Sequence, residues 1–288
     1  MIDTIELKIT ADDAKKLKPE DIERLIKKYS PFLIESKIRQ LNSKEIRIVL
    51  RLDPNKTRPL REFNKIILAI NKELKIKLNL NRFDIAFGFE KNINENKQLF
   101  YFFQASLTYV RTGSISNIFS TERDFDTINY KVKYGKNLET SVYDHTDKKN
   151  RFGKSRIENR ILNIRRNSKY NQIIKNHIIS YNSDLDKIIN DFSKVEEEIA
   201  EFLYKKWSQE RIKTNKISSY ISTLDCSGLI CTRDILDLLL KKMNYSGTTE
   251  SFIKNFRRQG KNRLKFETKG SISNLIKQIK SDNKFILK

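Results

Sequence analysis

The hydrophobic pattern of this chain changes its period once, near residue 168. Before that point, several segments alternate apolar and polar residues, which is typical of strands with one buried face. Beyond it, apolar residues recur every three or four positions, as in amphipathic helices. We therefore predict an α+β fold, in which an antiparallel-sheet domain with inserted helices precedes a mostly helical C-terminal domain.

The expected strands occupy 4–10, 45–52, 78–90, 98–110, 127–134, 139–144 and 156–165. Helical spacing is found at 60–75 and again through 168–206. The segment 231–266 is typical of a helix, a turn with glycine, a second helix and a basic strand or loop. These patterns predict two domains, 1–182 and 183–288.

The chain carries a formal net charge of +22 at pH 7, which favours a polyanionic partner. Codon bias in an AT-rich genome, which enriches Lys, Asn and Ile, would explain part of this charge. It does not explain why acids are depleted in particular windows. Ten Lys or Arg residues accompany a single acid in 148–175, and eleven accompany two acids in 254–288. Charge and clustering together predict nucleic-acid binding.

Several other classes of protein are disfavoured by what the sequence lacks. Cys226 and Cys231 have no second cysteine pair or histidine partner at zinc-binding spacing, so we expect reduced thiols. No phosphate-binding glycine loop and no nucleophile elbow is present. Because the sequence has no signal-peptide core and no long apolar run, we predict a soluble, cytoplasmic protein without a membrane partner.

Two carboxylates stand alone in strand-like segments. Asp84 lies among aromatic residues on the face opposite Phe83, and Glu158 shares a face with Arg160. Ordinary ion pairs with neighbouring arginines would account for both acids. Alternatively, two oxygen ligands on adjacent strands would hold Mg²⁺ or Mn²⁺, which need few protein ligands.

Two tyrosines are candidate nucleophiles for a phosphodiester. Tyr143 lies on the strand-like segment before that of Glu158, and Tyr170 begins a basic helix. Of the two histidines, His177 has apolar helical neighbours and is expected to pack. His145 lies in a turn, as a solvated residue or as a metal ligand.

The order of these segments resembles that of rolling-circle replication initiators, the phage and plasmid endonucleases that include the filamentous-phage replication protein and the Rep-trans plasmid initiators. The resemblance covers residues 1–175. The matching segments are Met1-Ile2-Asp3, Arg82-Phe83-Asp84, Val142-Tyr143-Asp144 with Thr146 and Lys148, and Arg156-Ile157-Glu158-Asn159-Arg160-Ile161.

The resemblance implies a metal-dependent nickase in which a tyrosine cleaves one strand at an origin and stays joined to the 5′ phosphate. Asp84 and Glu158 would hold the metal, with His145 as a third ligand. By correspondence with the phage protein, Tyr143 is the better candidate nucleophile. By its position on a helix that follows the strand of Glu158, Tyr170 is the better one, so both stay candidates. The His-hydrophobe-His metal motif of better-known relatives is missing here, and an aspartate-containing strand takes its place.

The implied partner is DNA, as a single-stranded or cruciform origin. A host helicase and a second copy of the chain are further partners that the resemblance allows. The expected nucleic-acid contacts are Arg156, Arg160, Arg165, Arg166, Arg257, Arg258, Lys261 and Arg263. Two alternatives stay open: a non-enzymatic initiator that binds origin repeats through winged-helix domains, and a structural protein that packages nucleic acid.

Overall fold

The computed structural model of the chain describes residues 1–9, 16–29, 33–42, 45–53, 60–93, 95–115, 129–144, 154–164, 170–210, 216–226, 230–260 and 264–288. The strands are β1 (Ile2–Ile9), β2 (Leu33–Asn42), β3 (Glu45–Leu52), β4 (Asn79–Phe89), β5 (Asn129–Tyr134), β6 (Leu138–Asp144) and β7 (Ser155–Ile161). The helices are α2 (Pro19–Tyr29), α3 (Leu60–Leu74), α4 (Lys97–Thr112), α5 (Tyr170–Asn190), α6 (Phe192–Glu210), α7 (Ile217–Cys226), α8 (Arg233–Lys242), α9 (Thr249–Arg258) and α10 (Lys269–Leu287).

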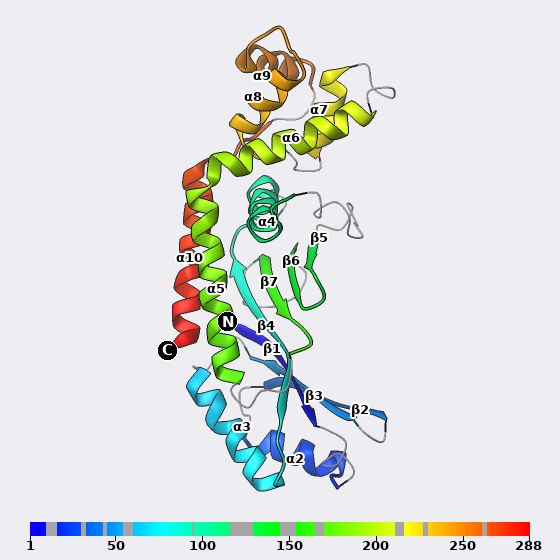
Figure 1. The fold of residues 1–288 in the computed structure, drawn as a ribbon, viewed down its shortest axis with the longest axis vertical. Coiled ribbons are helices and arrows are strands. Elements are labelled where there is room, and N and C mark those ends of the chain that lie inside the picture. Colours follow the sequence, from blue (N-terminus) through cyan, green and yellow to red (C-terminus); the bar gives the residue numbers. More distant parts are fainter. Residues whose placement is uncertain are drawn as a thin grey trace.

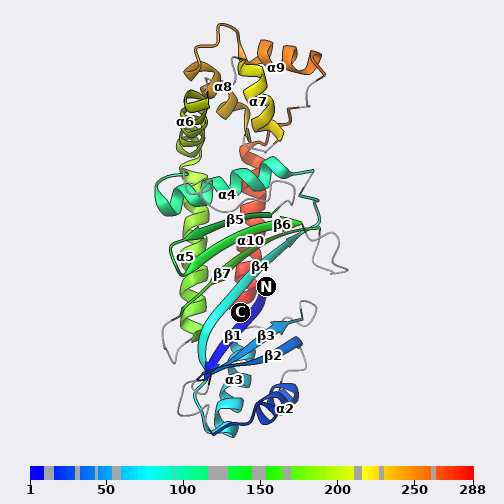
Figure 2. The same ribbon diagram turned by 90° about the vertical axis from the view of Figure 1, so that its right-hand side faces the viewer.

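The described strands form one seven-stranded sheet in the order β2-β3-β1-β4-β7-β6-β5. Every neighbouring pair is antiparallel. The long strand β4 joins the two halves of the sheet, because it pairs with β1 on one side and with β7 on the other (Figure 2). The predicted α+β class, with a sheet followed by a helical C-terminal region, is confirmed.

One face of the sheet packs against helices, and its side chains are mainly apolar. Because side chains alternate along each strand, the intervening residues point to the other face. Phe83 and Phe87 of β4 are fully buried there, with ring centroids 5.6 Å from His177 and 6.1 Å from Tyr181 of α5. Figures 1 and 2 show α5 and α10 side by side along this face. His177 therefore packs in the core, as expected, and burial lowers its pKa to about 3.

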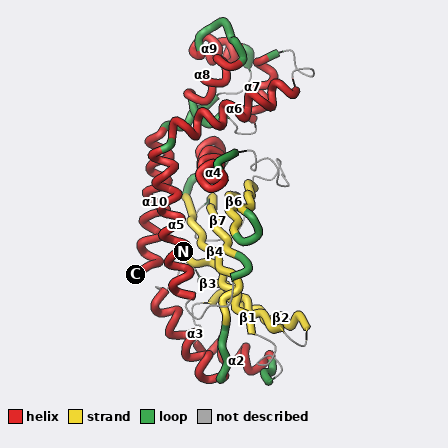
Figure 3. The backbone as a smooth tube through the Cα atoms, in the orientation of Figure 1, coloured by secondary structure: helices red, strands yellow, loops and turns green. Residues whose placement is uncertain are grey.

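The segment 98–110, which we expected to be a strand, is instead the centre of helix α4 (Figure 3). Its residues from Leu99 to Thr108 are all buried, so the helix is enclosed on all sides and its apolar residues show no period that separates it from a strand. Gly113 ends the helix with a φ of +70°, and its N–H donates to the carbonyl of Tyr109.

Helices α6 to α9 extend beyond α4 at one end of the molecule, and α10 returns from them to lie along α5 (Figure 1). Lys280 and Asn283 of α10 contact Asp186 and Asn182 of α5 at 2.5 and 2.7 Å. The predicted domain division after residue 182 falls within α5. The division into 1–182 and 183–288 stays a prediction.

A helix that crosses a membrane needs about 20 consecutive, mainly apolar residues. None of the helices formed by the described residues has the necessary length and hydrophobicity.

Candidate active site

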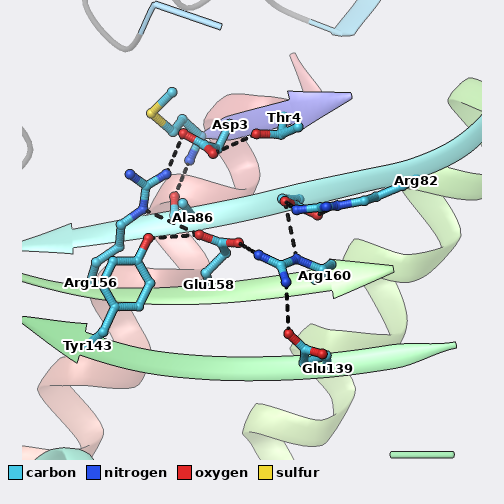
Figure 4. A network of polar contacts seen from close by, with 11 residues as sticks. Asp3, Thr4, Arg82, Ala86, Glu139, Tyr143, Arg156, Glu158 and Arg160 are labelled. Atoms are coloured by element: carbon cyan, nitrogen blue, oxygen red, sulfur yellow. Dashed lines mark hydrogen bonds and ion pairs between the residues drawn. The ribbon is translucent and has the colours of Figure 1, made fainter. Parts of the chain in front are cut away.

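The predicted site residues of β4, β6 and β7 share the sheet face opposite α5. Asp84 lies opposite Arg160 in the register of β4 and β7, and Tyr143 lies opposite Arg156 in that of β6 and β7. Glu158 is on the same face, because it stands two residues from Arg156 and from Arg160 on β7. The alternation that buries Ile157 under the helices therefore gathers these polar side chains (Figure 4).

Tyr143 donates its hydroxyl hydrogen bond to Glu158, with the phenolic oxygen 2.8 Å from Oε2. Burial raises the pKa of Tyr143 well above its ordinary value of 10, and the negative charge of Glu158 adds to the rise. The phenol therefore keeps its proton at neutral pH. Glu158 is correctly placed to accept that proton when the oxygen attacks an electrophile.

Arg160 binds carboxylates from three adjacent strands (Figure 4). Its nitrogens lie 2.9 Å from Glu158 Oε1, 3.0 Å from Glu139 Oε1 and 3.4 Å from Asp84 Oδ2. Glu139 was not among the predicted site residues. Its position two residues before Ser141 and four before Tyr143 on β6 puts it on the same face, so strand alternation could have identified it.

Arg156 is paired with Asp3 of β1, with Nη2 2.5 Å from Oδ1. The Arg156 side chain is only 3% exposed. Burial tends to raise the pKa of Asp3, but the charge of Arg156 and its hydrogen bond outweigh burial and lower it below the ordinary value. Asp3 lies in the Met1-Ile2-Asp3 segment that carried the resemblance, yet nothing in the sequence indicated that it would contact Arg156.

Asp84 is only 1% exposed and is held by Arg82, whose Nε lies 2.8 Å from Oδ1. Burial nevertheless raises the pKa of Asp84 to about 6. The arginines oppose this rise, whereas the nearby negative charge of Glu158 increases it. A buried carboxylate with a raised pKa beside two arginines makes this cluster a candidate functional site.

The fit of a divalent cation depends on the position of Arg160. Asp84 and Glu158 supply the carboxylate oxygens that Mg²⁺ and Mn²⁺ prefer. However, the guanidinium of Arg160 contacts both carboxylates, so it lies where a shared cation would have to bind. Within the described ranges, no three His, Cys, Asp or Glu side chains could hold a metal ion together. As arranged here, these residues do not form a metal site.

Tyr170 forms its hydrogen bond with a residue outside this cluster. It begins α5 and donates its hydroxyl hydrogen bond to Oδ1 of Asn64 on α3, at 2.5 Å. Burial raises its pKa above the ordinary value of 10. Of the two candidate tyrosines, Tyr143 is therefore the one that contacts a candidate carboxylate in the part of the chain that the structure describes.

The predicted nucleic-acid contacts at the C-terminal part are only partly described. Arg257 and Arg258 are exposed at the end of α9, next to Lys254. They line an open pocket of about 520 Å³ between α8, α9 and Phe266. His145, Arg165, Arg166, Lys261 and Arg263 lie outside the described residues.

Comparison with known proteins gives no match to a family model, to a curated protein or to a solved structure.

Proposed function

We propose that this protein nicks one strand of DNA at a replication origin by tyrosine transesterification, with Tyr143 as the nucleophile. The observation that carries the proposal is the 2.8 Å hydrogen bond from the Tyr143 hydroxyl to Glu158, beside the guanidinium of Arg156. A nucleophile, a base and a cation thus lie together on one face of the sheet. The net charge of +22 supports a polyanionic substrate.

In the proposed step, the phenolic oxygen of Tyr143 attacks the scissile phosphorus, and the bond from phosphorus to the 3′ oxygen breaks. Glu158 takes the phenolic proton as the new bond forms, and the departing 3′ oxygen takes a proton from water. The products are a 5′-phosphotyrosyl linkage and a free 3′-hydroxyl. Arg156 is close enough to offset the negative charge that develops on the phosphoryl group.

The requirement for Mg²⁺ or Mn²⁺ stays a prediction from the resemblance. Asp84 and Glu158 do not offer a cation site in this arrangement, because the guanidinium of Arg160 lies between them. The proposed step therefore uses no metal. The cytoplasmic location, expected from the sequence, and the helicase partner, allowed by the resemblance, also stay predictions.

The helical C-terminal part would supply a second contact with DNA. Lys254, Arg257 and Arg258 give α9 an exposed cationic surface, which suits a phosphate backbone. Thr248 caps the start of α9 by accepting a hydrogen bond from the Ser251 N–H, so the turn from α8 into α9 is well defined.

The second candidate is a non-enzymatic initiator that binds origin repeats. It is favoured by the pairing of Asp84, Glu139 and Glu158 with arginines, since such a network also occurs without a catalytic role. In that case the C-terminal helices would bind duplex DNA and the sheet would contribute no chemistry.

Covalent trapping separates the two candidates. Single-stranded oligonucleotides from the replicon, labelled at the 3′ end, are incubated with the protein in Mn²⁺, in Mg²⁺ or in chelator, and a denaturing gel is searched for a labelled protein band. We expect a band that is lost in Tyr143→Phe and kept in Tyr170→Phe. The reverse pattern would overturn the choice of nucleophile. Tight DNA binding with no band in any condition would favour the non-enzymatic initiator.

A further inference from the structure

The two arginines of β7 differ in what they contact. Arg160 is engaged by three carboxylates, those of Asp84, Glu139 and Glu158. Arg156 has one close carboxylate partner, Asp3, and its Nε lies 4.0 Å from Glu158 Oε2. Arg160 therefore neutralises three carboxylates of the network, whereas Arg156 has one close carboxylate partner and lies opposite Tyr143, the proposed nucleophile.

The guanidinium of Arg156 is a hydrogen-bond donor in a buried side chain. Among the described residues, Nε of Arg156 has no hydrogen-bond partner, although the side chain is only 3% exposed, whereas Nη2 is paired with Asp3. A buried donor without a hydrogen-bond partner destabilises the folded protein. Buried donors of this kind are useful where negative charge develops during a reaction, since they need no reorganisation at that moment.

The charge of Arg156 acts on the nucleophile itself. Burial and Glu158 raise the pKa of Tyr143, and Arg156 is the cation that opposes this rise. Figure 4 shows the Arg156 guanidinium between Asp3 on one side and the Tyr143–Glu158 pair on the other. Its position therefore depends on Asp3, which comes from a different strand.

Asp3 is itself held in place. Thr4 donates a hydrogen bond to Asp3 Oδ2 at 2.9 Å, while Oδ1 forms the ion pair with Nη2 of Arg156. Asp3 is 9% exposed. The carboxylate of Asp3 thus links β1 to the guanidinium of Arg156 on β7, across strand β4, which lies between them.

We propose that Asp3 is a positioning residue, which holds the buried N–H groups of Arg156 against the site where Tyr143 receives the scissile phosphoryl group. This inference rests on the proposed nicking reaction. Asp3 contacts neither Tyr143 nor the DNA in this scheme. Its negative charge contributes to the raised pKa of Tyr143, but it positions the site through Arg156.

The test compares Asp3→Asn and Asp3→Glu with wild type in single-turnover formation of the covalent adduct. We expect Asp3→Asn to slow the adduct by about tenfold to a hundredfold, the usual effect of removing a group that orients a functional residue. Oligonucleotide affinity should stay within about twofold, and Asp3→Glu should recover part of the rate. Glu6→Gln is the matched control, because Glu6 lies on the same strand and pairs with Arg47 instead.

A second measurement detects positioning without requiring nicking. The side-chain Nε–H of Arg156 is followed by NMR with ¹⁵N-arginine and assigned by its loss in Arg156→Lys. Its solvent exchange should be slow in wild type and in Glu6→Gln, and faster in Asp3→Asn. Wild-type rates of adduct formation and of Nε–H exchange in Asp3→Asn would overturn the role of Asp3 while leaving the nickase intact. Absence of adduct in wild type would instead overturn the nickase, and the exchange rates would then decide the positioning by themselves.

Discussion

Replacing Asp84 with asparagine should stabilise the folded protein while removing a site carboxylate. The pKa of Asp84 rises from 3.8 to about 6, because its ionised form is buried. A rise of this size means that ionised Asp84 costs the folded state about 3 kcal/mol at neutral pH, relative to the unfolded chain. Asparagine fills the same space without ionising, so Asp84→Asn should recover up to about 3 kcal/mol of unfolding free energy.

The size of this effect depends on pH in a defined way. Below the ordinary value of 3.8, Asp84 is protonated in both states, and the variant and wild type should be equally stable. As the pH rises toward about 6, only the folded wild-type carboxyl retains its proton, so wild type loses stability relative to the variant. Above that value the difference should be constant. Urea unfolding followed by circular dichroism, from pH 4 to 8, measures it.

Asp3→Asn is the control of opposite sign. Arg156 lowers the pKa of Asp3, so its ionised form stabilises the folded state. This variant should be less stable than wild type near neutral pH, and the difference should shrink as the pH falls through the lowered pKa. If Asp84→Asn were also less stable than wild type above pH 6, the arginines would hold Asp84 as a structural ion pair. Ionisation of Asp84 would then favour folding, the opposite of what its raised pKa predicts.

Three further predictions concern Tyr170, helix α9 and the metal requirement of the site. Tyr170→Phe removes one buried hydrogen bond to Asn64 and should lower the unfolding free energy by about 1 kcal/mol, measured by urea titration, with adduct formation retained. Arg257→Ala and Arg258→Ala should each reduce the slope of log affinity for duplex DNA against log salt by about 1, and unchanged slopes would remove α9 from the DNA contact. Chelation of divalent cations should abolish the adduct if Asp84 and Glu158 hold a metal, whereas a band that survives chelation would favour Arg160 as the resident cation of the site.

The faces of the central strands could be predicted from the sequence. Phe83 and Phe87 alternate with Asp84, and Ile157 alternates with Glu158, so each carboxylate had to face away from the apolar layer. This regularity holds whatever the strand pairs with, because it is a property of the extended backbone. The prediction failed for α4, where buried residues on all sides gave no period. Its length of 16 residues was the better signal, since most strands are shorter.

The choice between Tyr143 and Tyr170, and the role of Asp3, depended on which segments become neighbours. By itself, the sequence determined the polarity of each strand face, the change from strands to helices and the excess of positive charge. Only the tertiary structure decided that β7 lies between β4 and β6, that Arg160 gathers three carboxylates and that Asp3 reaches Arg156 from β1. The physical reason is that periodicity is local, whereas strand order and register follow from packing the whole apolar face against α4, α5 and α10.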